Sequence, residues 1–140
     1  MATIYAVIDT NVIVSALLTR NRDAATARVL DMVISQMRIT PLYNDEIITE
    51  YNNVLKRETF GFPSELIDAI INLIVVRGLD SQRVSTTYEH FPDPKAVVFY
   101  EVALSKEDAY WVTGNIKHFP RTPIVVTPAE MIAMINQSFP

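Results

Sequence analysis

The chain has 140 residues, of which 49% are hydrophobic and 20% are charged. This length and composition suit one folded domain with a sizeable core, and they exclude a disordered or collagen-like chain. Sixteen acidic residues against twelve basic ones give a net charge of -4. A protein that holds nucleic acid mainly by counterion release should be basic, so contact with nucleic acid would need a local basic patch or a metal ion.

Rare and missing residue types exclude several further classes. The chain has no cysteine, which excludes disulfides, zinc–thiolate sites and thiol catalysis and is typical of a reducing compartment. Its three glycines, Gly61, Gly78 and Gly114, cannot form a P-loop or a GxGxxG motif. The start lacks the basic residues and the length of a signal peptide, and the most apolar stretch, residues 66–76, is too short to span a bilayer. We therefore expect a soluble, cytoplasmic protein.

The apolar residues predict strands and helices that alternate along the chain. Short runs with little polar interruption indicate strands of a parallel sheet, and apolar residues at helical spacing indicate helices. The predicted strands are residues 4–8, 38–40, 84–87, 109–113 and 124–126. The predicted helices are one that reaches residue 18 and those at residues 24–34, 45–57, 64–78, 94–104 and 128–136.

Several of these helices begin with recognisable capping signals. Asp23, Asn44 and Asp93 are candidate N-caps, and residues 127–130 match a capping box. No linker or repeat interrupts the alternation of strands and helices. The sequence therefore predicts a single α/β domain over residues 1–140, with a mainly parallel central sheet flanked by helices.

Asp9 is the first candidate functional residue. It directly follows the apolar run at residues 4–8, and a carboxylate at the carboxyl end of a buried strand lies where open α/β sheets bind ligands. The alternative is that Asp9 caps the next helix, a role that aspartate serves well. Position alone leaves both interpretations open. The nearby small polar residues Thr10, Asn11 and Ser15 could orient a metal-binding carboxylate through hydrogen bonds.

Glu50 is the second candidate, because it shares a predicted helical face with the apolar residues Ile47 and Val54. A carboxylate on such a face is costly unless it is paired or bound to a cation. The simpler interpretation is a position at the rim or a salt bridge with Lys56, Arg57 or another cation. Together with Asp9, however, two inward carboxylates from separate elements suggest a site for a hard cation, which prefers oxygen ligands.

Asp93 and Asn115 are weaker candidates. Asp93 precedes a predicted helix, so a role as its N-cap is a strong alternative. Asn115 follows Val112-Thr113-Gly114 at the end of a predicted strand, which would place an amide oxygen beside the carboxyl end of the sheet. Its alternative is a turn residue after glycine, since asparagine tolerates such conformations.

These segments together resemble a PIN domain. The chain contains, in this order, Asp9-Thr10-Asn11-Val12, Glu50-Tyr51, Asp93-Pro94-Lys95, Val112-Thr113-Gly114-Asn115 and Val126-Thr127-Pro128. The ordered set covers nearly the whole chain and is similar to the VapC-like group, the toxin component of toxin–antitoxin pairs. The resemblance implies a ribonuclease that depends on Mg²⁺ or Mn²⁺, in which acidic residues hold one or two metal ions that activate water to hydrolyse RNA phosphodiesters.

The resemblance also implies roles for individual residues, with one departure. The implied metal ligands are Asp9, Glu50 and Asn115, the implied catalytic set adds Asp93, and the supporting residues are Thr10, Asn11, Ser15 and Thr113. The family's third acid falls at position 96, where this chain has Ala96 in Asp93-Pro94-Lys95-Ala96. Because alanine offers no oxygen to a metal, we expect weakened Mg²⁺ binding and an inactive or badly impaired enzyme. An engineered detoxified variant and a natural pseudoenzyme both fit this departure.

Expected partners follow from the same resemblance. They are an RNA substrate, a cognate antitoxin protein and a second copy of the chain, with no membrane. The apolar helix at residues 66–76 is either a core helix or a dimer contact. Basic residues that could contact phosphates, or that are simply solvated surface charges, are Lys56, Arg57, Lys95, Lys117 and Arg121. The alternative function is a catalytically inactive PIN-like module that binds RNA or protein.

Overall fold

The computed structural model describes residues 3–85, 94–114 and 122–138. Within these residues, all strands belong to one sheet with the order β3-β2-β1-β4-β5, and each neighbouring pair is parallel. The strands are β1 (Ile4–Ile8), β2 (Ile39–Tyr43), β3 (Leu79–Asp80), β4 (Ala109–Val112) and β5 (Val125–Val126). The predicted α/β class with a mainly parallel sheet is confirmed.

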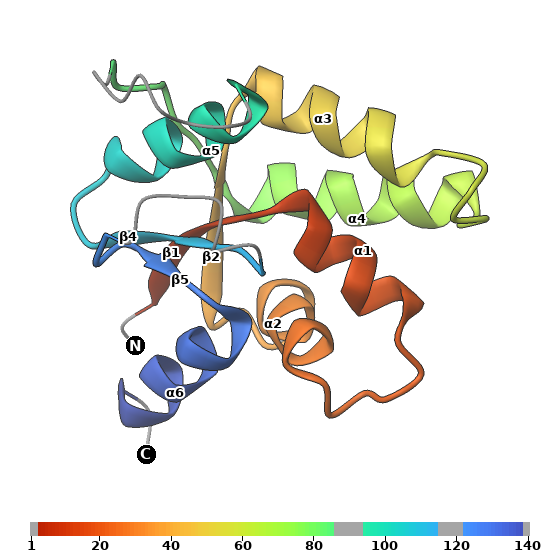
Figure 1. Cartoon of the computed structure of the whole chain (residues 1–140), viewed down its shortest axis with the longest axis horizontal. Coiled ribbons are helices and arrows are strands. Elements are labelled where there is room, and N and C mark those ends of the chain that lie inside the picture. Colours follow the sequence, from red (N-terminus) through yellow and green to blue (C-terminus); the bar gives the residue numbers. More distant parts are fainter. Residues whose placement is uncertain (1–2, 86–93, 115–121, 139–140) are drawn as a thin grey trace.

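Helices connect these strands and cover both faces of the sheet. The helices are α1 (Thr10–Leu18), α2 (Ala25–Ile34), α3 (Asp45–Leu55), α4 (Ser64–Arg77), α5 (Pro94–Leu104) and α6 (Pro128–Ser138). Helix α5 packs on β1 and β4 at one face, and α2 and α6 lie together on the other (Figure 1). Among the helices of the described residues, none has the length and apolar character that a membrane span requires.

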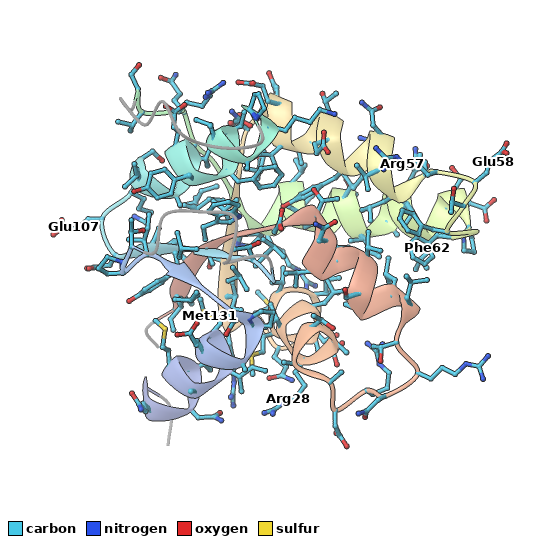
Figure 2. All side chains as sticks on the ribbon, in the orientation of Figure 1. Arg28, Arg57, Glu58, Phe62, Glu107 and Met131 are labelled. Carbon is cyan, nitrogen blue, oxygen red and sulfur yellow. The ribbon has the colours of Figure 1, made fainter. Side chains whose placement is uncertain are left out.

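An aromatic cluster joins the helices to the central strands. Trp111 of β4 is fully buried, and its ring centroid lies 6.4 Å from those of Phe99 and Tyr100 in α5. The ring of Tyr51 in α3 lies 6.2 Å from Phe99. On the other side of the sheet, α6 contributes the buried Met131 (Figure 2). These contacts fix α3 and α5 relative to the strands that carry the site.

Two of the predicted capping signals are confirmed and one is wrong. The Asn44 side chain accepts a hydrogen bond from the backbone N–H of Ile47 at 2.9 Å, and Thr127 and Glu130 exchange the two hydrogen bonds of a capping box. Asp23 does not cap α2, because the N-cap position is Ala24. The backbone N–H of Asp23 instead donates to the Asn21 side chain, so a turn occupies the residues just before the helix.

The sheet edge differs from the prediction. Val84 and Ser85 lie in no strand, and the other half of the predicted strand at 84–87 is outside the described residues. The edge strand is instead β3, which follows directly after Gly78. A Cβ at Gly78 would collide with the backbone carbonyls of Pro41 and Ile74, so glycine lets the chain come close enough to pair with β2.

Helix α4 shows that the two interpretations offered for residues 66–76 are not exclusive. One face is in the core, where Ile67, Ile70, Ile71 and Ile74 are buried. The other face leaves apolar side chains in solvent, and Val76 is 70% exposed. The helix is therefore a core helix with an additional apolar surface. The exposed apolar residues on α4 and at the neighbouring β3 are Leu66, Val75, Val76 and Leu79.

Candidate functional site

The site lies at the carboxyl ends of β1 and β4. From β1 the chain adds β2 and β3 on one side of that strand, and then β4 and β5 on the other side. The strand order therefore reverses between the neighbours β1 and β4. Ligands of open α/β sheets bind outside the carboxyl ends of strands at such a point. Asp9 directly follows β1, and Thr113 directly follows β4.

The carboxylate of Asp9 is held by the neighbouring strand. Its Oδ2 accepts a hydrogen bond of 2.8 Å from the hydroxyl of Thr113, which is fully buried. The backbone N–H of Asp9 donates to the carbonyl of Val112 at 2.9 Å. Asp9 occupies the N-cap position of α1 by its backbone, but its side chain makes no capping hydrogen bond. The cap interpretation therefore describes the backbone alone, and the carboxylate is positioned at the sheet edge.

Tyr51 ties α3 to the same place. Its buried hydroxyl donates a hydrogen bond of 2.5 Å to the carbonyl of Ile8, the last residue of β1. Burial raises the pKa of Tyr51 well above its usual range, and the nearby Asp9 carboxylate raises it further. The hydroxyl thus stays protonated and keeps donating. As a result, the residue before it in α3, Glu50, is carried on a helix that is anchored beside Asp9.

Glu50 forms an ion pair with a residue of α5. Its side chain is 21% exposed, and its Oε2 lies 3.7 Å from Nζ of Lys95. The two side chains line a hollow of about 90 Å³ together with Glu46, Val98 and Phe99. A salt bridge of Glu50 is therefore confirmed, but its cation is Lys95 of α5. Lys56, one of the two cations named from the sequence, pairs with Asp68 instead.

Ala96, the position of the expected third acid, is 7% exposed and contributes only a methyl group. Among residues 3–85, 94–114 and 122–138, no three His, Cys, Asp or Glu side chains gather so that they could hold a metal ion. The predicted site residues Asp93 and Asn115 lie outside the described residues. Of the predicted metal ligands, the structure describes Asp9 and Glu50, and these two carboxylates fit a metal ion only in part.

The supporting residues on α1 have different surroundings from Thr113. Asn11 and Ser15 are exposed and line a hollow of about 310 Å³ with other small polar and apolar residues, including Thr26 and Gly114. The Thr10 side chain is buried, and its hydroxyl makes no hydrogen bond to any described residue. Among the predicted supporting side chains, Thr113 is the one that the structure shows bound to Asp9.

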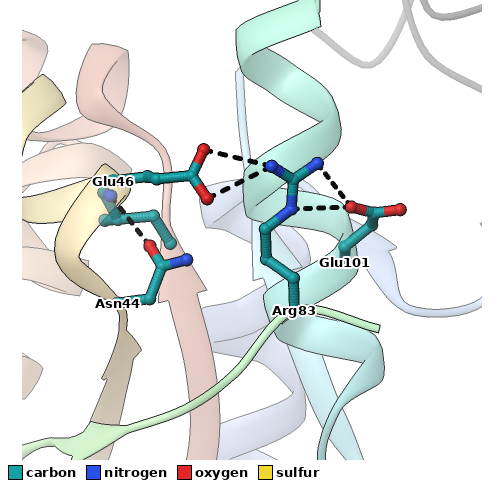
Figure 3. A network of polar contacts seen from close by, with 5 residues as sticks. Asn44, Glu46, Arg83 and Glu101 are labelled. Atoms are coloured by element: carbon teal, nitrogen blue, oxygen red, sulfur yellow. Dashed lines mark hydrogen bonds and ion pairs between the residues drawn. The ribbon is translucent and has the colours of Figure 1, made fainter. Parts of the chain in front are cut away.

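An arginine that the sequence arguments missed joins the two helices of the site (Figure 3). Nε and Nη2 of Arg83 lie 2.7 and 2.6 Å from Oε1 of Glu101 in α5, and Nη1 lies 3.0 Å from Oε2 of Glu46 in α3. Glu101 is only 5% exposed. Desolvation alone lowers the pKa of Arg83, but hydrogen bonds to Glu101 and Glu46 outweigh it and raise that pKa. A carboxylate in the otherwise apolar run of α5 was the signal that could have revealed this contact.

The remaining basic candidates divide into separate groups. Lys56 pairs with Asp68 of α4 at 2.6 Å. Arg57 lies with Glu58 and Phe62 near the connection between α3 and α4 (Figure 2). Lys117 and Arg121 lie outside the described residues. Among the described residues of this group, Lys95 lies beside a predicted site carboxylate, Glu50.

A comparison with known families agrees with this geometry. A family model described as PIN domain matches residues 5–117, a span that includes Asp9, Glu50 and Ala96. No curated protein matches the chain. The PIN domain is a nuclease-type fold whose members typically use divalent metal ions. Because the match covers more than half of the chain and agrees with its parallel sheet, the chain belongs to the PIN-domain family.

Proposed function

We propose that this chain is a divalent-metal-dependent ribonuclease of a toxin–antitoxin pair, impaired because Ala96 replaces a metal-binding aspartate. The observation that carries the proposal is the placement of Asp9. Its carboxylate lies at the point where the strand order reverses. A hydrogen bond from the buried Thr113 holds the carboxylate there, and the carboxylate makes no capping hydrogen bond to α1. Such a preorganised carboxylate suits a metal ligand, and the PIN fold makes RNA phosphodiesters its expected substrate.

The donor set supports impairment. Mg²⁺ needs near-octahedral oxygen geometry and gives up its waters reluctantly, so the number of carboxylates strongly affects how well it binds. The described residues offer Asp9 and Glu50, while position 96 presents a buried methyl group. Mg²⁺ or Mn²⁺ is thus the proposed cofactor, and its binding is expected to be weak.

The alanine at position 96 also favours a second candidate, a PIN-like module that binds RNA or protein without catalysis. Such a protein would keep the fold and would not need the metal ligands, as the alanine at position 96 suggests. A calorimetric titration with Mn²⁺ separates the two candidates. Heat of binding at millimolar Mn²⁺ supports the impaired nuclease, whereas no binding supports the module.

The proposed partners are RNA, a cognate antitoxin protein and a second copy of the chain. Support for a protein contact comes from the exposed apolar side chains on α4 and β3, among which Val76 is 70% exposed. Burying apolar surface of this kind against another protein is more favourable than leaving it exposed to water. The cytoplasm, where antitoxin and RNA would be met, is the proposed location.

The experiment that tests the proposed function is RNA cleavage by the unmodified chain and by Ala96→Asp, each with Mg²⁺ and with chelator. Ala96→Asn is a matched control, because it has the shape of aspartate without its charge. We expect Mg²⁺-dependent cleavage by Ala96→Asp, less by Ala96→Asn, and little by the unmodified chain. Full activity of the unmodified chain would contradict impairment. No cleavage by a folded Ala96→Asp variant would contradict the ribonuclease assignment.

A further inference from the structure

The side chain of Lys95 places a positive charge at the hollow between α3 and α5. Lys95, in the first turn of α5, lies with its Nζ 3.7 Å from Oε2 of Glu50. The lysine side chain is 70% exposed, and the glutamate side chain is 21% exposed. The ammonium group therefore approaches from solvent toward a carboxylate that is mostly covered by the protein.

The other carboxylate of this hollow is committed elsewhere. Glu46 lies one helical turn before Glu50, and both of its oxygens contact Nη1 of Arg83, at 3.0 and 3.2 Å. The remaining lining residues, Val98 and Phe99, are apolar. Within the described lining of the hollow, the positive charge of Lys95 is thus matched with the negative charge of Glu50.

We propose that Lys95 takes the place of a metal ion at Glu50 and thereby weakens the binding of divalent cations to this site. This inference rests on the proposed function, in which Asp9 and Glu50 form what remains of a metal site. A divalent cation at Glu50 would use the carboxylate that the ammonium group contacts, and it would be repelled by that group. With a methyl group at position 96, no acid there offsets the repulsion.

The effect of Lys95 should be moderate because its side chain is mostly in solvent. An ion pair between exposed side chains contributes little to the free energy, so the loss of the Lys95–Glu50 pair on metal binding costs little. The repulsion between the ammonium group and a divalent ion a few ångströms away is a further cost of metal binding. Replacing Lys95 by a neutral residue should tighten Mn²⁺ binding by about three- to tenfold. The length and polarity of glutamine make Lys95→Gln the mildest replacement.

The test is a Mn²⁺ titration followed by electron paramagnetic resonance, in which the signal of free aqueous Mn²⁺ reports the unbound ion. The variants are Lys95→Gln, Lys95→Arg and Glu50→Gln. A matched control is Lys56→Gln, because Lys56 also pairs with an acid on a helix, at 2.6 Å from Asp68. We expect tighter binding for Lys95→Gln, no gain for Lys95→Arg or Lys56→Gln, and weaker binding for Glu50→Gln.

The outcomes separate this inference from the proposed function. The role of Lys95 is overturned if Lys95→Gln binds Mn²⁺ no more tightly than the unmodified chain. If Glu50→Gln nevertheless binds Mn²⁺ more weakly, the metal site itself still stands. Mn²⁺ binding that is absent in every variant at millimolar concentration overturns both the metal site and the role of Lys95. A gain that Lys56→Gln shares to the same extent also overturns the inference, because the effect would then come from net charge alone.

Discussion

The two carboxylates of the site are held in different ways. Asp9 extends from the end of a central strand and is bound by a fully buried hydroxyl from the neighbouring strand. Glu50 projects from a helix and is paired with a lysine whose side chain is mostly in solvent. The sheet thus preorganises one ligand, whereas the helices leave the other with a replaceable partner. Of the two carboxylates in the proposed metal site, the one at the strand ends is therefore the more firmly held.

Helices α3 and α5, which form the helix side of the site, are nevertheless joined by Arg83. The variant Arg83→Met tests this contact and should cause the largest loss of stability among the variants proposed. Arg83 joins Glu46 of α3 to Glu101 of α5, and removing the arginine takes this cation away from a carboxylate that is only 5% exposed. Breaking such a pair from one side should lower the free energy of unfolding by about 3 kcal/mol. Chemical denaturation measures this change.

A matched double variant sharpens the Arg83 prediction. Arg83→Met combined with Glu101→Leu removes the buried carboxylate as well, so most of the lost stability should return. A single variant as stable as the unmodified chain would show that the contact does not hold α3 and α5 together.

Thr113→Val tests the strand side of the comparison. Valine nearly preserves the shape of threonine but cannot donate to Oδ2 of Asp9. Because hydrogen bonds to charged groups are stronger than neutral ones, we expect a loss of about 2 kcal/mol in unfolding free energy. Thr113→Ser keeps the hydroxyl and serves as the control, so it should retain more stability than Thr113→Val. A Thr113→Val variant as stable as the unmodified chain would contradict a stabilising role of this hydrogen bond.

Tyr51→Phe tests the link between the two sides. The variant loses the hydrogen bond to the carbonyl of Ile8, which should cost about 1 kcal/mol at neutral pH. The pKa of Tyr51 is raised from its ordinary value of 10.0 in the folded chain, so above about pH 10 the unfolded state loses a proton that the folded state keeps. The contribution of Tyr51 to stability is therefore full below pH 10 and falls as pH rises further.

The pH dependence gives Tyr51→Phe a second readout. Alkaline denaturation curves should show a shallower loss of stability above pH 10 for the variant than for the unmodified chain. Identical slopes for the two proteins would contradict a buried, protonated Tyr51.

The smallest effect is expected for Lys56→Gln. The Lys56–Asp68 pair is short, at 2.6 Å, but its side chains are 36% and 61% exposed. Solvent screens such a pair, so the unfolding free energy should change by less than about 1 kcal/mol. Thermal unfolding at low and high salt checks this, and a loss as large as that of Arg83→Met would contradict the role assigned to burial.

Much of the fold was predictable because its signals are local. The apolar run of β1, the Asn44 cap and the Thr127–Glu130 capping box each lie within a few residues, and each is found in the structure. Strand β3 was not predictable in this way. Both of its residues are exposed, so it has no buried apolar pattern, and its position depends on the close approach of Gly78 to β2.

The candidate site was predictable in its residue types more than in its contacts. The resemblance to the PIN family indicated Asp9 and Glu50, and their surroundings support polar or ionic roles. The partners came from far away in the sequence: Thr113 is 104 residues from Asp9, and Arg83 is 37 residues from Glu46. Pairings at such distances are set by the tertiary fold, which no local pattern encodes.

We propose that the strand side of the metal site is intact and that Ala96 leaves the helix side incomplete. Calorimetric titration of Mn²⁺ into the unmodified chain and into Ala96→Asp tests it most directly. Since even residues that only support metal ligands change affinity by about 10- to 100-fold, restoring the acid should tighten binding at least about tenfold. Equal affinity in the two proteins would contradict the claim.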